Sequence, residues 1–372
     1  MQLRTLIDAE ALAKLLGDPR LRLFDCRFDL ARPEDGRRRY LDGHLPGALY
    51  ADINRDLAAP ATATSGRHPL PSPAVFEARL RSWGVDSDSL VVAYDDGNGM
   101  YAARLWWMLR WLGHDEVAVL DGGLRRWLEL DLPETDEVPQ SVAGNFVAHP
   151  RKWMAVDAAA VLGASADPRA RILDARAPER YRGEVEPIDA VAGHVPGAHN
   201  HPFVQSLDGE GRFLPPLALR EALARSLGGA PPARTIAMCG SGVTACHLLL
   251  ALEHAGLPGA LLYPARGASG RATRRGPCAP AIRPEAARRD GNSFRGCFCY
   301  RARHFFRARS GADPPWKMPH PSPDRAAPGA SRTQSSCTAS TPGATATSAS
   351  TRPATSSCGR TRRPTARSTC TR

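Results

Sequence analysis

The sequence lacks any run of about 18 or more apolar residues, the length that a helix needs to cross a bilayer. Its first residues, MQLRTLIDAEALAKLLGDPR, carry acidic side chains and lack the apolar stretch and cleavage site of a secretory signal. Cysteine is scarce before residue 265, where Cys26, Cys239 and Cys246 are the only ones, so a disulfide framework is excluded. No pair of CxxC motifs marks a zinc site. We therefore expect a cytoplasmic protein with no metal, no cofactor and no membrane association.

Acidic side chains are scarce in the last part of the chain. The whole sequence has 49 Lys+Arg and 38 Asp+Glu, a net charge of +11. Residues 266–372 hold 21 of the basic and 4 of the acidic side chains, which leaves 28 basic and 34 acidic ones, a net charge of −6, in residues 1–265. The basic excess thus belongs to the tail alone, and specific nucleic-acid binding by the body is not expected.

The body of the chain carries an internal repeat. In each half a short apolar segment ends in Asp-x-Arg, at Asp25–Arg27 and at Asp174–Arg176. A Gly-His-x-Pro-Gly-Ala turn follows in both, at Gly43–Ala48 and at Gly193–Ala198. The offset of about 150 residues is too long for a solenoid repeat and indicates a duplicated domain.

Within each copy, short segments rich in Val, Ile and Leu alternate with amphipathic stretches. Strands are predicted at Leu90–Tyr94 and Glu116–Leu120, and helices at Pro73–Trp83 and Ala102–Leu112. Strands that are apolar on both faces and alternate with helices are typical of a parallel sheet covered by helices on each side. The sequence therefore predicts an α/β protein with a first domain at 1–135, a linker at 136–150, a second domain at 151–264 and a disordered basic tail at 265–372.

One strand of the second copy leads into a glycine-bearing loop headed by a cysteine, in the stretch TIAMCGSGVTACHLLLALEHAGL. A strand, a tight loop and a helix N-terminus aim several backbone N–H groups at one point, which favours a negative charge there. Such a position favours the thiolate of Cys239 and makes it a candidate nucleophile. An inert buried cysteine is the alternative, but it leaves Gly240 and Gly242 unexplained. Cys246, one helical turn further on among apolar residues, is expected to pack in the core.

The paired Asp-x-Arg and Gly-His-x-Pro-Gly-Ala motifs, together with CGSGVTA, resemble the tandem-domain rhodaneses, the thiosulfate and 3-mercaptopyruvate sulfurtransferases. The resemblance covers roughly residues 1–264 and implies two rhodanese-like domains. It implies that a sulfane sulfur moves from a small-molecule donor, through a persulfide on Cys239, to a thiol, cyanide or thioredoxin-like acceptor. Asp95 stands in the first copy where a cysteine would be, which implies a catalytically silent first domain.

The residues beside the cysteine bear on the sulfur donor. Thiosulfate-type members resemble each other in placing basic residues directly after the cysteine, whereas Gly240 and Ser241 are neutral here. Neutral residues suit 3-mercaptopyruvate better, because the leaving pyruvate needs a proton that Ser241 could relay. Asp52 and His68 match the positions of an aspartate and a histidine in mercaptopyruvate-type members. A turn aspartate and a loop histidine without catalytic roles are the alternatives.

The resemblance also implies a substrate-binding set. Arg180 fits the arginine that binds the donor's carboxylate, and the loop contributes Gly240, Gly242, Val243 and Thr244. The second arginine that mercaptopyruvate-type members carry is missing from the segment EVEPIDAVAGH.

Two other function classes are open to a sequence of this kind. Cysteine phosphatases need an arginine six residues after the nucleophile to hold the phosphoryl group, and Ala245 occupies that position, which argues against them. A non-catalytic rhodanese-like regulatory or binding protein, inactivated by C-terminal truncation, remains the alternative function.

The resemblance stops abruptly after Tyr263 and Pro264. Family members continue here with Gly-Ser-Trp-Ser-Glu-Trp, which can be encoded as GGC TCG TGG AGC GAG TGG G. Deleting the first base gives GCT CGT GGA GCG AGT GGG, which encodes the Ala-Arg-Gly-Ala-Ser-Gly found at residues 265–270. We therefore expect that a one-base deletion near codon 264 has shifted the frame, and that residues 265–372 have no evolved function. A natural disordered basic tail is the alternative.

Overall fold

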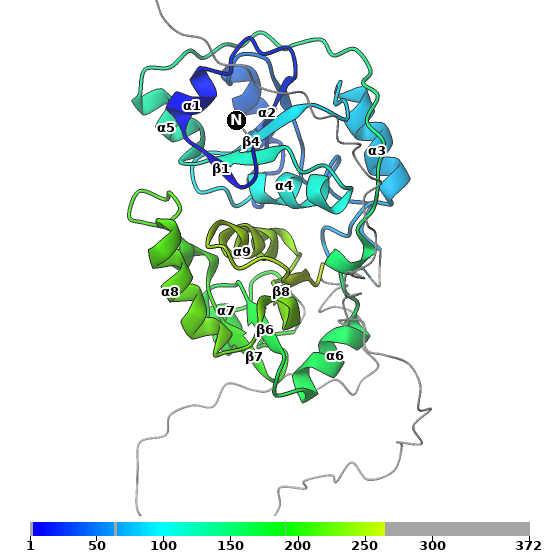
Figure 1. Cartoon of the computed structure of the whole chain (residues 1–372), viewed down its shortest axis with the longest axis vertical. Coiled ribbons are helices and arrows are strands. Elements are labelled where there is room, and N and C mark those ends of the chain that lie inside the picture. Colours follow the sequence, from blue (N-terminus) through cyan, green and yellow to red (C-terminus); the bar gives the residue numbers. More distant parts are fainter. Residues whose placement is uncertain (1–2, 63–64, 190, 265–372) are drawn as a thin grey trace, which may run out of the picture. The chain divides into compact units, whose positions relative to one another are not determined.

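The computed structural model describes residues 3–62, 65–189 and 191–264 of the 372-residue chain (Figure 1). These residues form two sheets, one in each half, and every strand pair in both sheets is parallel. The first sheet has the order β1-β5-β4-β2-β3, made of β1 (Leu6–Ile7), β5 (Val117–Leu120), β4 (Leu90–Tyr94), β2 (Leu21–Asp25) and β3 (Ala48–Tyr50). The second has the order β7-β6-β8-β9, made of β7 (Ala198–Asn200), β6 (Arg171–Asp174), β8 (Thr235–Met238) and β9 (Leu261–Leu262). The predicted α/β class with parallel sheets is confirmed.

Helices accompany both sheets. The first half contains α1 (Ala9–Ala13), α2 (Asp35–Asp42), α3 (Pro73–Ser82), α4 (Ala102–Trp111) and α5 (Gly123–Glu129). The second half contains α6 (Ala158–Ala166), α7 (Pro178–Arg182), α8 (Pro216–Leu227) and α9 (Val243–His254), with 3-10 turns at η1 (Lys152–Met154), η2 (Phe203–Ser206) and η3 (Pro232–Arg234).

Local signals explain several of these boundaries. Helix α3 begins where the Ser72 hydroxyl accepts a hydrogen bond from the Val75 N–H at 3.3 Å, and Pro73 supplies the fixed backbone angle of a first helical residue. Helix α6 begins in the same way at Asp157, whose carboxylate accepts from the Ala160 N–H at 3.0 Å. Strand β4 has the predicted bounds, and β5 begins one residue later than predicted, at Val117.

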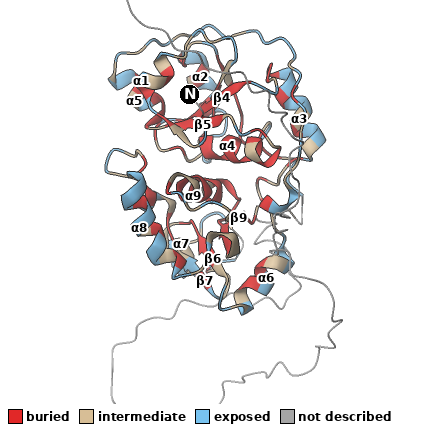
Figure 2. Cartoon of the chain, in the orientation of Figure 1, coloured by how far each residue is buried: buried red, intermediate tan, exposed pale blue. Residues whose placement is uncertain are grey.

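Helices α4 and α9 join the two halves. They pack against each other, and nearly every residue of both is buried, as Figure 2 shows. One hydrophobic cluster runs through both helices and includes Trp106 and Trp107 of α4 with Leu248 and Leu252 of α9. The His247 Nε2 of α9 lies 3.0 Å from the carbonyl oxygen of Asn98 in the first half. The first and second halves therefore share a core.

The remaining predictions concern the domain boundaries and the tail. Residues 130–151, between α5 and η1, contain no helix or strand, and His44 bridges to Thr135 within this segment. The boundaries at 135 and 150 stay predictions. The predicted tail, 265–372, lies outside the described residues. No helix in the described part of the chain has the length and apolar character to cross a membrane.

Candidate active site

The candidate site lies where the strands of the second sheet end. Asp174, the last residue of β6, is paired in register with Met238, the last residue of β8, and Cys239 follows directly. The carboxyl ends of parallel strands meet at one edge of a sheet, the usual place for a ligand in this architecture. The topology thus brings the Asp-x-Arg motif and the cysteine loop together.

The cysteine loop points backbone donors at the sulfur. The Sγ of Cys239 accepts from the Gly242 N–H at 3.0 Å and from the Ser241 N–H at 3.5 Å. Gly242 has φ +80°, a left-handed conformation that suits glycine, and it is the N-cap of α9. The sulfur therefore sits at a helix N-terminus, where a negative charge is stabilised.

A cavity of about 230 Å³ opens beside this sulfur. Most of the loop residues singled out from the sequence line it, together with side chains of the first half. The lining includes Cys239, Gly240, Ser241, Val243, Thr244, Arg180 and His68, along with Phe28, Arg67, Tyr101 and Phe203. Cys239 and Ser241 are 5% and 7% exposed, so any donor that reaches them is largely shielded from water.

His68 enters the cavity wall from the first half. Its Nε2 lies 2.9 Å from the Asn54 Oδ1, an acceptor, so Nε2 carries the proton. Its Nδ1 is buried and has no partner among the described residues. Burial, reinforced by the nearby Arg104 and Arg67 charges, lowers the pKa of His68 to about 4. The ring is therefore neutral at pH 7 and offers an unused acceptor.

Asp52 is not among the lining residues. Its Oδ1 accepts from the N–H groups of Asn54 at 2.7 Å and Arg55 at 3.0 Å, which closes the turn that follows β3. Because Asn54 in turn hydrogen-bonds to His68, Asp52 is linked to the cavity wall through Asn54 and His68. No contact between Asp52 and Ser241 occurs in the described part of the chain.

Arg180, on the short helix α7, belongs to a network of charges. Its Nη2 lies 2.7 Å from the Glu186 Oε1 and 2.8 Å from the Asp189 Oδ2. Burial alone would raise the pKa of Glu186, but hydrogen bonds from Arg180 and from two backbone N–H groups lower it overall. Asp189 is also paired with Arg67, which comes from the first half. The sequence indicated Arg180, and it gave no signal for the Arg67–Asp189 pair.

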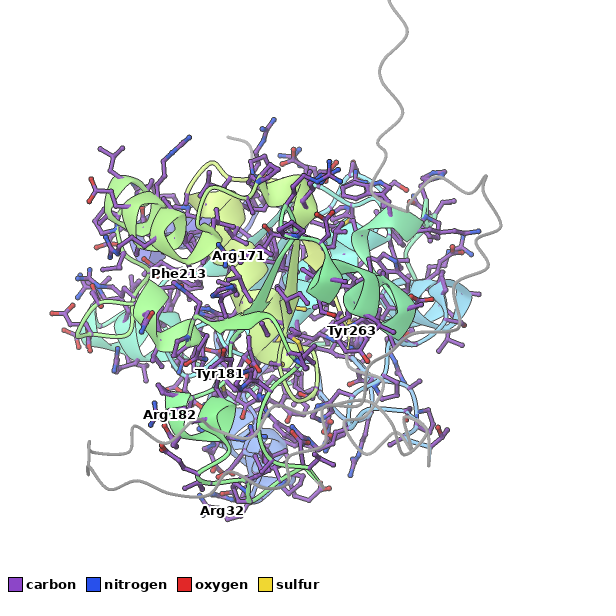
Figure 3. The ribbon with its side chains drawn as sticks, turned by 90° about the horizontal axis from the view of Figure 1, so that it is seen from below. Arg32, Arg171, Tyr181, Arg182, Phe213 and Tyr263 are labelled. Carbon is purple, nitrogen blue, oxygen red and sulfur yellow. The ribbon has the colours of Figure 1, made fainter. Side chains whose placement is uncertain are left out.

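Next to the loop, buried hydrogen bonds hold the carboxyl end of β6 in place. Arg176 binds both oxygens of Asp174 and donates through Nη2 to the Gly193 carbonyl at 2.7 Å. Tyr181, labelled in Figure 3, donates to the Ala198 carbonyl at 2.5 Å, and its ring stacks on His194 at 3.8 Å. The Asp-x-Arg and Gly-His-x-Pro-Gly-Ala motifs thus hold each other in place, and Ala175 and Arg176 of the first motif also line the cavity beside Cys239.

Comparison with known proteins agrees with this geometry. A model of the "Rhodanese-like domain" family matches residues 8–130. A probable 3-mercaptopyruvate sulfurtransferase of Pseudomonas aeruginosa is 48% identical over 260 residues, which cover 69% of this chain and 92% of that protein. The chain belongs to the rhodanese family. It is an enzyme of the sulfurtransferase class.

Two further relatives of this rhodanese are named after different sulfur donors. The thiosulfate sulfurtransferase of Bos taurus is 36% identical over 253 residues, covering 66% of this chain and 83% of that protein. The crystal structure of the 3-mercaptopyruvate sulfurtransferase SseA from Escherichia coli superimposes with a TM-score of 0.63 and 35% identity, covering 70% of this chain and 97% of that one.

One buried residue of this rhodanese gave no signal in the sequence. Arg104, on α4 of the first half, is fully buried and donates to the carbonyls of Leu57 and His68. Its Nη1 has no hydrogen-bond partner in the described part of the chain, and a Cβ added to Gly242 would lie 3.3 Å from it. A buried positive charge from the first half therefore lies next to the cysteine loop.

The described residues of this rhodanese contain no group of His, Cys, Asp and Glu side chains that could hold a metal ion. A larger cavity of about 870 Å³ lies at the corresponding loop of the first half, where Asp95 and Tyr101 line it. Its other lining side chains are mostly charged and include Arg38, Arg39, Asp96 and Arg125. Each half of the molecule thus has a cavity at its strand-to-helix loop.

Proposed function

We propose that this rhodanese transfers a sulfane sulfur from 3-mercaptopyruvate to a thiophilic acceptor through a persulfide on Cys239. The observation that carries the proposal is the Cys239 sulfur, held by the Gly242 and Ser241 N–H groups at the floor of a cavity. The same donors can hold the outer sulfur of a persulfide, which is also an anion.

The chemistry balances without a cofactor. The Cys239 thiolate attacks the donor's sulfur, a new S–S bond forms, and the carbon–sulfur bond breaks. Its electron pair leaves with the pyruvate carbon, which takes up the proton that the donor's thiol has lost. Thiolate and mercaptopyruvate thereby become persulfide and pyruvate.

Ser241 is the proposed proton relay. It follows the nucleophile by two residues and lines the same cavity. His68, neutral with a pKa of about 4, borders that cavity with an unused Nδ1 acceptor. The neutral pair Gly240 and Ser241 favours mercaptopyruvate over the dianion thiosulfate.

Gly240 has a reason of its own to be glycine. A Cβ there would lie 2.7 Å from the Asp189 Oδ2 and 2.9 Å from an Arg67 nitrogen. A basic residue at 240 would therefore disturb the charge network, so a switch toward thiosulfate is better sought with Ser241→Lys alone. We expect that variant to raise kcat/KM for thiosulfate relative to mercaptopyruvate. A parent enzyme with equal or higher kcat/KM for thiosulfate would reverse the donor assignment.

Mutation of the cysteine tests the nucleophile. Cys239→Ser is expected to lower sulfur transfer by about a thousandfold or more and to abolish the added sulfur that mass spectrometry detects after donor treatment. Cys246→Ser is the matched control, because Cys246 is fully buried on α9 and burial raises its pKa to about 12. Transfer that survives Cys239→Ser would exclude the proposal.

Acceptor and location form the finer part of the proposal. A thiol, cyanide or a thioredoxin-like protein is the proposed acceptor, since each offers a nucleophile for the outer sulfur. A cytoplasmic location agrees with the three cysteines of the described residues, all of which are free thiols.

We propose further that residues 265–372 are a frameshifted translation. Pro264 lies against the cysteine loop, since a Cβ on Gly242 would be 3.1 Å from its Cα, so a changed sequence begins directly beside the site. Sequencing the DNA around codon 264 tests this. Restoring one base should give a chain with Gly-Ser-Trp-Ser-Glu-Trp after Pro264 and a higher Tm and activity. A confirmed present frame, with a 1–264 truncation less active than the full chain, would exclude it.

A further inference from the structure

The carboxylate of Asp189 is held between two arginines from different halves of the molecule. Its Oδ2 lies 2.8 Å from the Arg180 Nη2, and its Oδ1 is paired with the Arg67 Nη1. The Asp189 side chain is 8% exposed, compared with 16% for Arg180 and 28% for Arg67. One buried carboxylate thus satisfies one donor of each arginine.

This carboxylate lies beside the cysteine loop, next to Gly240, although Asp189 itself is not among the residues that line the cavity. A Cβ on Gly240, the residue after the nucleophile, would lie 2.7 Å from the Asp189 Oδ2, 2.9 Å from the Arg67 Nη2 and 3.4 Å from the Arg180 Nη2. Arg67 and Arg180 both line the cavity that holds Cys239. A mercaptopyruvate whose sulfur meets Cys239 carries its carboxylate only two carbons further on, toward these arginines.

The neighbouring Glu186 shows what a structural carboxylate looks like here. It accepts from the N–H groups of Ile188 at 3.1 Å and Asp189 at 2.9 Å, in addition to its arginine partners, and it is 4% exposed. The contacts of the Asp189 carboxylate in the described part of the chain are with the two arginines alone. Asp189 can therefore leave without stranding a backbone donor, provided that another carboxylate takes its place.

Arg67 also has an unused hydrogen-bond donor. Its Nε is buried and has no partner among the described residues. A carboxylate that approached the Nε edge of the guanidinium would gain a second, parallel hydrogen bond, the geometry that arginine favours with carboxylates. An incoming donor can thus be held at least as well as Asp189 is.

We propose that Arg67 and Arg180 bind the donor's carboxylate together, and that Asp189 is a built-in competitor that occupies this site until the donor displaces it. The inference rests on the proposed function. Arg67, supplied by the silent half, takes the part of the arginine missing from the segment after α7. While Asp189 is in place, the two arginines already face two carboxylates, so a third is repelled. The enzyme then binds its donor more weakly than the bare site would.

Pyruvate binding tests the proposal without turnover. In the full chain carrying Cys239→Ser, calorimetry gives the Kd for pyruvate, the product, which has no sulfur to transfer. Asp189→Asn removes the competing charge with little change in shape, and we expect the Kd to fall about tenfold. Arg67→Gln should raise the Kd about tenfold, both alone and combined with Asp189→Asn. Arg169→Gln, which removes a 72% exposed arginine paired with Asp167, is the matched control and should change nothing.

Pyruvamide, which lacks the charge, separates carboxylate recognition from changes in cavity shape, and its binding should not respond to these variants. With Cys239 intact, Asp189→Asn should lower KM for mercaptopyruvate and leave kcat close to the parent value.

An unchanged or higher pyruvate Kd in Asp189→Asn, with an unchanged Tm, overturns the proposal. A pyruvate Kd that is the same in Arg67→Gln as in the parent also overturns the proposal. If Asp189→Asn does not fold, Asp189 is a structural residue and the proposal is equally lost. Failure of the proposed function would appear separately, as absence of the persulfide while pyruvate binding still follows the predicted pattern.

Discussion

The two strand-to-helix loops of this rhodanese direct backbone N–H groups at different side chains. In the first half, the Asp95 carboxylate accepts from four backbone N–H groups, those of Gly97 and Tyr101 among them, at 2.9–3.3 Å. In the second half, the Cys239 sulfur accepts from two, those of Ser241 and Gly242. Both side chains follow a central strand and precede a buried helix, so the two loops share their arrangement of backbone donors and differ in the side chain that accepts from them.

Loop length separates the two cases. Residues 96–101 lie between Asp95 and α4, whereas residues 240–242 lie between Cys239 and α9. The longer loop wraps around a carboxylate that cannot leave, because it is part of the chain. The shorter loop begins directly after Cys239, whose sulfur accepts a second sulfur and releases it under the proposed function. Under the proposed function, the backbone N–H groups of this loop have a structural role in the first half and a chemical role in the second.

The framework behind the loops has changed far less. Arg27 binds Asp25 and donates to the Gly43 carbonyl at 2.5 Å, as Arg176 binds Asp174 and donates to the Gly193 carbonyl. The buried Asp–Arg pair therefore belongs to the sheet edge in both halves. The loops after β4 and β8, by contrast, differ in length and in the side chain that accepts the backbone hydrogen bonds.

The largest effect that we predict comes from removing the Asp95 carboxylate of the first half. Asp95→Ala leaves four buried N–H donors without partners and should lower the free energy of unfolding by about 3–5 kcal/mol. Urea denaturation measures this. The matched control is Asp96→Ala, which removes a carboxylate that is 53% exposed and paired with Arg39, and should cost at most about 1 kcal/mol. Equal losses in the two variants would mean that the Asp95 carboxylate has no structural function.

A second, smaller effect compares one buried histidine from each half. Burial, with a contribution from Arg225, lowers the pKa of His201 to about 4, and His68 in the first half is lowered to about 4 as well. The unfolded chain binds these protons near pH 6.5 and the folded chain does not. Stability is therefore complete above pH 6.5 and falls as the pH drops from 6.5 to 4, by up to about 3 kcal/mol for each histidine.

Denaturation curves between pH 4 and 7.5 measure this loss. His201→Gln should remove about one histidine's share of it, because the glutamine cannot titrate. His149, which is exposed, gives the control variant His149→Gln. A pH dependence that is the same in the parent and in His201→Gln would contradict the assigned pKa.

Periodicity and motif spacing were sufficient for the parts of the fold that depend on local sequence. β4, the start of α3 and the position of Cys239 before α9 follow from short segments in which apolar residues, a cap or a glycine stand at fixed intervals. The duplicated motifs gave the two-sheet architecture. Each of these features is decided within about one helix or strand of its own residues.

The ion pair between Arg67 and Asp189 could not be predicted from the sequence, for a physical reason. Arg67 and Asp189 are 122 positions apart, and neither carries a mark that distinguishes it from the many surface charges of the chain. Their contact depends on how α4 and α9 bring the halves together. Asp52 illustrates the reverse problem. Its position in the sequence suggested a role at the active site, but its carboxylate accepts hydrogen bonds from the nearby backbone N–H groups of Asn54 and Arg55.

The smallest predicted effect concerns the cysteines that do not react. Cys26 and Cys246, one in each half, are both fully buried, and burial raises the pKa of each thiol. Among the cysteines of residues 1–264, iodoacetamide at pH 7.5 should therefore alkylate Cys239 in the folded protein and leave Cys26 and Cys246 intact, because the thiolate is the reactive form. Cys246→Ala should lower the free energy of unfolding by only about 1 kcal/mol, the loss expected for one small buried group. Peptide mass mapping after alkylation decides the first point, and a donor pulse beforehand should protect Cys239 from direct thiol alkylation. Modification of Cys26 or Cys246 at a rate comparable to that of Cys239 would show that the shared core opens readily. The contrast between a reactive loop and an inert framework would then no longer hold.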